Sequence, residues 1–193
     1  SLELIKENAE AIFQDKKKFF GIGGEHLVTL PALQAAVNHF KDIVVIHFDA
    51  HTDLRKEYLG EEMSHSAVLY HIGSIIGFEN IKQIGIRSGM KDEFELMGKY
   101  NTRLNFPEQL TQFVNKNVFV TVDLDVLDPS IMSGTGTPEA GGLTFNELMD
   151  WFKKLQGLNI IGADVVELAP DYDTSGVSTA VATKVIRELL MCI

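Results

Sequence analysis

Hydrophobic residues follow two patterns along this chain, short unbroken runs and longer segments at helical spacing. Unbroken runs without polar alternation occupy 43–48 and 118–122, which is typical of strands that are covered on both faces. Further strands are predicted at 19–22, 81–86 and 159–166. Because such strands have no solvent face, we expect helices to cover both sides of the sheet.

Apolar residues at helical spacing predict the segments between these strands. The predicted helices are 2–14, 27–40, a helix capped by Ser64 with apolar positions from Ala67 to Ile72, 92–99, 144–155 and 178–190. Thr144 and Glu147 match a capping box, and Pro31 falls in a first turn, where a missing amide costs little. The order is one helix followed by five strand–helix units. This order predicts an α/β fold, a three-layer αβα arrangement around a mainly parallel sheet.

Polar side chains gather where the predicted strands end. In αβα folds, ligands bind beyond the carboxyl ends of the strands. The residues in these positions are His26, Asp49, His51, Asp53, Asp123, Asp125 and Glu167. They come from four strand ends, so we expect them to converge on one site.

The spacing of the aspartates and histidines predicts a pair of metal ions. Asp49, His51 and Asp53 occupy alternate positions, as do Asp123 and Asp125. In an extended segment, residues two apart point the same way, about 6 to 7 Å from each other. A carboxylate so placed can bridge two ions held about 3.5 to 4 Å apart. Four carboxylates with two imidazoles, counting His26, suit Mn²⁺ best, with Zn²⁺, Co²⁺ or Fe²⁺ as alternatives.

Four other polar residues have more ordinary interpretations. His47 lies inside a strand, which favours a hydrogen-bonded core histidine over a ligand. Asp128 precedes a Pro and a Ser, as a turn-capping residue does. His39 and His71 fall on predicted helices, where surface or packing roles are usual. These residues are left out of the predicted site.

Composition and charge narrow the class of protein. At 193 residues and 45% hydrophobic, the chain is expected to form one globular domain over 1–193. Seventeen basic against 27 acidic residues give a net charge of −10, which disfavours nucleic-acid or anionic-membrane partners. Cys192 is the only cysteine, so a reducing, cytoplasmic location fits. No apolar stretch approaches the roughly 18 residues of a membrane span, and no leader sequence opens the chain.

A family resemblance adds to these inferences. The motifs GGEH, DAHTD, SHSA, VDLDVLDPS, GTGTPEAGGLT and DVVELAP occur in this order, and together they resemble the arginase/agmatinase (ureohydrolase) family from Gly23 to the C-terminus. The resemblance implies a binuclear manganese centre held by the same six residues that the spacing selects. It also implies that His65 shuttles protons and that Glu167 grips a guanidinium group. Taken alone, Glu167 is either a capping acid or a partner for a cation, and His65 is otherwise a plain helix-start residue.

The reaction that the resemblance implies is hydrolysis of a guanidinium to urea and an amine. Asp53 or Asp123 would receive the proton of the attacking hydroxide, and His65 would relay one to the leaving amine. Thr29-Leu30-Pro31 after GGEH resembles agmatinases, so agmatine, a polyamine precursor, is the expected cationic substrate. Arginases have Asn where this chain has Arg55, and arginine or guanidinobutyrate are the alternative substrates. Rival hypotheses are a non-catalytic metal-binding homologue and a binuclear phosphoesterase.

Two departures from the family pattern affect the expected assembly. Glu25 stands where relatives usually have Asp, and relatives usually begin with a further strand and helix. Without that strand a sheet edge would be exposed, so we expect either additional N-terminal residues in the full protein or a partner over the edge. The family's trimers and hexamers make a homo-oligomer the expected state.

Overall fold

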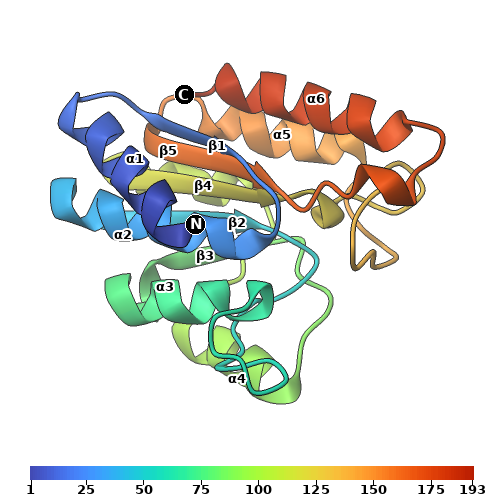
Figure 1. Cartoon of the computed structure of the whole chain (residues 1–193), viewed down its shortest axis with the longest axis horizontal. Coiled ribbons are helices and arrows are strands. Elements are labelled where there is room, and N and C mark those ends of the chain that lie inside the picture. Colours follow the sequence, from blue (N-terminus) through green and yellow to red (C-terminus); the bar gives the residue numbers. More distant parts are fainter.

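A five-stranded sheet forms the centre of the computed structural model, which describes residues 1–193 (Figure 1). The strands are β1 (Phe19–Ile22), β2 (Ile43–Phe48), β3 (Ile81–Ile84), β4 (Asn117–Asp123) and β5 (Asn159–Val166). They lie in the order β1-β5-β4-β2-β3, and every neighbouring pair is parallel. The predicted parallel sheet is therefore confirmed, with β1 and β3 at its edges.

Six α-helices cover the two faces of this sheet. They are α1 (Leu2–Gln14), α2 (Thr29–His39), α3 (Val68–Ile76), α4 (Lys91–Tyr100), α5 (Phe145–Leu155) and α6 (Val177–Leu190). Helices α1, α2 and α3 lie on one face and α5 and α6 on the other (Figure 1), which confirms the three-layer αβα arrangement. Helix α4 contributes Met97 to the core on the face of α1, α2 and α3. None of the helices has both the length and the apolar character that crossing a bilayer requires.

The unbroken apolar runs are explained by two separate cores, one on each face of the sheet. Along β2, Val44, Ile46 and Phe48 pack into the core beneath α5 and α6. Ile43 and Val45 point the other way, into the core beneath α1, α2 and α3. Successive side chains of a strand alternate between faces, so a strand between two cores needs apolar residues at every position.

Some element boundaries differ from the prediction. Ser64 does not cap a helix with its side chain; it meets the hydroxyl of Ser66 at 3.0 Å, and a short 3₁₀ turn, His65–Ala67, precedes α3. The strand predicted at 81–86 ends at Ile84, because Gly85 turns the backbone with a φ of +90°. By contrast, the capping box of Thr144 and Glu147 is confirmed at the start of α5.

Candidate metal centre

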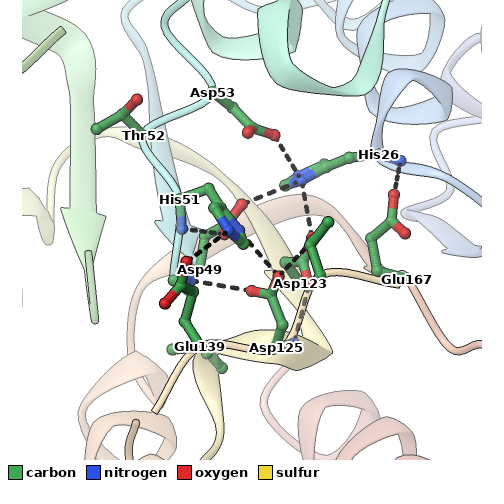
Figure 2. A network of polar contacts seen from close by, with 12 residues as sticks. His26, Asp49, His51, Thr52, Asp53, Asp123, Asp125, Glu139 and Glu167 are labelled. Carbon is green, nitrogen blue, oxygen red and sulfur yellow. Dashed lines mark hydrogen bonds and ion pairs between the residues drawn. The ribbon is translucent and has the colours of Figure 1, made fainter. Parts of the chain in front are cut away.

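The carboxyl ends of β1, β2, β4 and β5 meet at one rim of the sheet and bring the predicted residues together (Figure 2). His26 begins a 3₁₀ turn, His26–Val28, after β1, and Asp49 directly follows β2. Asp123 is the last residue of β4, and Asp125 lies on the 3₁₀ turn Leu124–Val126 that follows. Parallel pairing aligns these ends, so residues far apart in sequence become neighbours.

The Nδ1 atom of His26 lies at the centre of three carboxylates. It is 3.2 Å from Asp49 Oδ2, 3.1 Å from Asp53 Oδ2 and 3.3 Å from Asp123 Oδ2. Although His26 is fully buried, this atom makes no hydrogen bond of acceptable geometry. The other ring nitrogen, Nε2, is 2.9 Å from the hydroxyl of Thr121. A histidine whose Nε2 is held by a hydrogen bond while Nδ1 faces carboxylate oxygens has the arrangement of a metal ligand.

A second group of potential ligands shares Asp49 with the first. His51 Nδ1 lies 2.9 Å from Asp125 Oδ2 and 3.4 Å from Asp49 Oδ1. Candidate ligand atoms of Asp49, His51 and Asp125 all lie within 4.8 Å of one another, as do those of His26, His47, Asp49 and Asp53. Asp49 belongs to both groups, so its carboxylate would be shared between them if two cations were bound here.

The backbone reaches this geometry by turns, so the expectation of extended segments is wrong for two of the residues. Asp53 has a left-handed φ of 50°, and its carbonyl accepts hydrogen bonds from Leu69 and Tyr70 at the start of α3. Asp125 lies on a 3₁₀ turn, and its backbone N–H donates to Asp123 Oδ1 at 2.9 Å. Their side chains still reach the cluster, because both turns lie at the rim of the sheet, beside the other candidate ligands.

The electrostatics of the cluster indicate a need for cations. Burial raises the pKa of Asp123 well above its usual range and that of Asp53 to about 6, and the charge of Asp49 adds to both effects. Burial opposes protonation of His51, but its hydrogen bonds to Asp125 and Asp49 raise its pKa to about 11. Without metal, the proton that these contacts favour on His51 offsets part of the charge of the buried carboxylates. Divalent ions that displaced this proton would supply the same compensation more fully.

His47 supports this cluster from inside the sheet. Its Nε2 lies 2.7 Å from Asp49 Oδ2, and its Nδ1 lies 3.1 Å from the side-chain nitrogen of Gln83. Since the amide of Gln83 donates, His47 Nδ1 accepts and Nε2–H donates to Asp49. The prediction of a buried, hydrogen-bonded histidine is confirmed.

A polar cavity of about 510 Å³ opens over the cluster, and only one of its 18 lining residues is hydrophobic. Glu167 reaches it from the end of β5, where a left-handed φ of 66° turns the residue out of the strand. Its Oε1 accepts from the backbone N–H of His26 at 2.7 Å, and burial raises its pKa. His65 lines the same cavity, its ring 5.8 Å from that of Tyr58.

Asp128 lies outside the cluster, as predicted. Its carboxylate accepts from the backbone N–H groups of Ser130, Gly141 and Gly142 at 2.8 to 3.1 Å. The hydrogen bond from the Ser130 side chain, together with those from these backbone groups, lowers its pKa to about 2. Asp128 therefore closes a turn instead of facing a ligand.

Two buried polar residues behind His26 were not predicted from the sequence. Thr121 and Asp164 are register partners on β4 and β5, and both are essentially inaccessible to solvent. Neither carboxylate oxygen of Asp164 has a hydrogen-bond partner. Each residue is a polar interruption of an otherwise apolar strand, a signal in the sequence that would have identified them.

Burial raises the pKa of Asp164 to about 6, and this gives a testable pH dependence. An unfolded Asp titrates near about 3.9, so between these values the native state binds more protons and loses stability as pH rises. In metal-free protein we expect Asp164→Asn to remove a loss of about 3 kcal/mol between pH 4 and pH 7. Urea denaturation followed by Trp151 fluorescence measures it. Parallel pH curves for variant and wild type would contradict this expectation.

Comparison with known proteins identifies relatives that share nearly the whole chain. A sequence model of the arginase family matches residues 1–192. The agmatinases of Halalkalibacterium halodurans and Bacillus subtilis are each 42% identical, over 99% of this chain and 69% of their own lengths. A solved structure from Clostridium difficile, described as a candidate agmatinase, aligns with a TM-score of 0.96 and 46% identity over 100% of this chain and 73% of that one. Arginase from Medicago truncatula aligns with a TM-score of 0.84 and 30% identity over 97% and 63%.

Proposed function

This chain belongs to the arginase family of metal-dependent hydrolases, and on that premise we propose that it hydrolyses agmatine to putrescine and urea with two Mn²⁺ ions. The observation that carries the proposal is the position of Glu167, whose carboxylate lines the same cavity as His26, His51, Asp53 and Asp123. A guanidinium group bound by Glu167 would lie beside the candidate metal centre.

The six residues proposed as metal ligands are His26, Asp49, His51, Asp53, Asp123 and Asp125. The absence of a hydrogen-bond partner at His26 Nδ1 and the position of Asp49 in both ligand groups support this assignment. Carboxylates with imidazoles and no thiolate favour Mn²⁺ over softer metals. When bound, the two ions would lower the pKa of a water molecule toward neutrality and so supply hydroxide.

Glu167 is proposed to orient the substrate. A carboxylate pairs with a guanidinium through two parallel hydrogen bonds, which fix the plane of the group. The backbone N–H of His26 already holds one oxygen of Glu167, so the carboxylate has a defined direction. This would present the guanidinium carbon to the attacking oxygen and shorten the search for a reactive geometry.

The charges around the cavity favour a substrate with a cationic tail. Arg55 lies 3.6 Å from the buried carboxylate of Glu93, which offsets its charge. Glu25 and Glu139 also line the cavity, and neither forms an ion pair with Lys or Arg. An ammonium tail therefore meets a net negative surface, whereas the carboxylate tail of guanidinobutyrate would be repelled. This supports agmatine over guanidinobutyrate and arginine.

His65 is proposed to pass a proton to the amine that leaves when the C–N bond breaks, and Asp53 or Asp123 to take up the proton of the hydroxide. We expect His65→Ala to lower kcat for urea release by about 100-fold while both metal ions stay bound. Free imidazole added to the variant should restore part of the rate. Unchanged turnover with bound metal would remove His65 from the proposed mechanism.

A urea-release assay after loading with Mn²⁺ tests the function as a whole. Agmatine, arginine and guanidinobutyrate are compared at equal concentrations, and agmatine is expected to give the highest kcat/KM. Release from arginine alone would overturn the substrate assignment. Bound metal without urea release from any of the three would instead favour the non-catalytic metal-binding homologue.

The organisation of the protein is proposed along the same lines. We treat residues 1–193 as one ureohydrolase domain, a proposal supported by the single sheet to which every helix packs. A homo-oligomer, either a trimer or a hexamer, and a cytoplasmic location remain predictions.

A further inference from the structure

Arg87 lies just beyond β3, behind the candidate metal centre, and binds only backbone carbonyl groups. Its guanidinium donates to six of them at 2.7 to 3.5 Å: Gly85, Asp125, Val126, Leu127, Glu139 and Ala140. None of the protein's ion pairs involves Arg87. Its positive charge is therefore stabilised by backbone carbonyl dipoles and is not neutralised by a carboxylate.

These carbonyls belong to three separate segments of the chain. Gly85 directly follows β3, Asp125 lies on the 3₁₀ turn after β4, and Glu139 lies in the loop between residues 133 and 142. The shortest contacts, at 2.7 and 2.8 Å, go to Glu139 and Asp125. The guanidinium thus joins the turn that carries one proposed ligand to the loop that forms one wall of the cavity.

The loop packs directly on this guanidinium. A Cβ atom added to Gly142 would lie 2.7 Å from Arg87 Nη2 and 2.5 Å from the backbone nitrogen of Asp128. From its other end the loop reaches the centre itself, since the Thr137 hydroxyl lies 3.4 Å from Asp125 Oδ2. The loop therefore contacts Asp125 directly through Thr137 and indirectly through Arg87.

We propose that Arg87 is a positioning residue that fixes Asp125 and the cavity wall 136–139 as one unit, and so sets the affinity of one of the two metal sites. A planar group with five donors in fixed directions can hold carbonyls from several segments at once. A lysine keeps the charge, but its single nitrogen cannot span them. The inference rests on the proposed function, since it concerns the same metal centre.

Arg87→Lys tests this inference with readouts other than activity. Titration with Mn²⁺, followed by electron paramagnetic resonance of the free ion, should show one of two bound ions weakened by about 10- to 100-fold. A Glu-specific protease should cut the metal-free variant faster after Glu139, whose side chain is 45% exposed. The KM for agmatine should also rise, because the cavity wall 136–139 would be held less firmly in the variant.

Arg103→Lys is the matched control, because Arg103 also donates to a backbone carbonyl, that of Ile86 at 3.0 Å, but contacts neither the turn nor the loop. It should leave Mn²⁺ affinity and loop cleavage unchanged. Gly142→Ala would disturb the contact between Arg87 and the loop from the side of the loop, and it should weaken the binding of the same Mn²⁺ ion. This second variant keeps the test decisive if Arg87→Lys fails to fold.

Two results would overturn the inference. One is an Arg87→Lys protein that binds both ions as the wild type does. The other is a variant with a lower melting temperature but unchanged cleavage after Glu139, because a merely structural role predicts this. A wild type that binds no Mn²⁺ would count against the proposed function instead, and cleavage of the metal-free proteins would still decide the role of Arg87.

Discussion

Asp49→Asn should lower urea release by at least about 1000-fold, which corresponds to about 4 kcal/mol of transition-state stabilisation. The carboxylate of Asp49 is the one member common to both groups of candidate ligands. It also accepts from His47 at 2.7 Å and faces His26 Nδ1 at 3.2 Å. An amide has one oxygen and one donor nitrogen, so it cannot bridge two cations and would turn a donor toward one of these histidines. Loss of metal and loss of activity should coincide.

Metal content after dialysis, measured by mass spectrometry beside the urea assay, checks this expectation. Asp150→Asn is a suitable control, since Asp150 is an exposed residue of α5 whose carboxylate only pairs with Lys153. The control should keep two ions and full turnover. An Asp49→Asn protein that retained both would remove Asp49 from the proposed centre.

Glu167→Gln should lower kcat/KM for agmatine by about 30- to 5000-fold, with the metal content unchanged. This factor corresponds to a loss of about 2 to 5 kcal/mol of transition-state stabilisation. The glutamine side chain still offers an oxygen to the backbone N–H of His26, a contact of 2.7 Å in the structure. The local fold is therefore kept while the charge that binds a guanidinium is lost. This separates substrate binding from metal binding within one cavity.

Steady-state kinetics with agmatine, together with Mn²⁺ stoichiometry, tests this prediction. Glu95→Gln removes an exposed carboxylate on α4 that pairs only with Lys91, so it should behave as the wild type. If Glu167→Gln kept its kcat/KM, the guanidinium would have to be held elsewhere. If it lost metal instead, Glu167 would belong to the metal centre.

The fold was predictable from sequence because burial on both faces leaves a clear pattern. The runs at β2 and β4 have no polar alternation, and in the structure they separate two cores. Boundaries were less predictable, since they depend on contacts with distant segments. Gly85 ends β3 where a Cβ would meet the backbone oxygen of Asp49 at 2.9 Å, and no local pattern contains that information.

The candidate site was predictable for a different reason. Charged residues directly after apolar strands are costly unless they face a ligand, and parallel strands place all their carboxyl ends at one rim. The supporting residues were not found, because their roles depend on pairing across the sheet. Thr121 on β4 lies under His26 only because β5 alone separates β4 from β1, the strand that His26 follows. Arg87 donates to the backbone carbonyl of Glu139, which is 52 residues away in the sequence.

In the proposed mechanism, the residue that binds the guanidinium, Glu167, also has a left-handed backbone that costs stability. A non-glycine residue with φ of 66° carries a conformational penalty of about 1 kcal/mol. Glycine would relieve that penalty, but it would remove both the proposed guanidinium partner and the carboxylate that accepts from the backbone N–H of His26. The stability of the backbone and the proposed contact with the substrate therefore make opposite demands on the residue at this position.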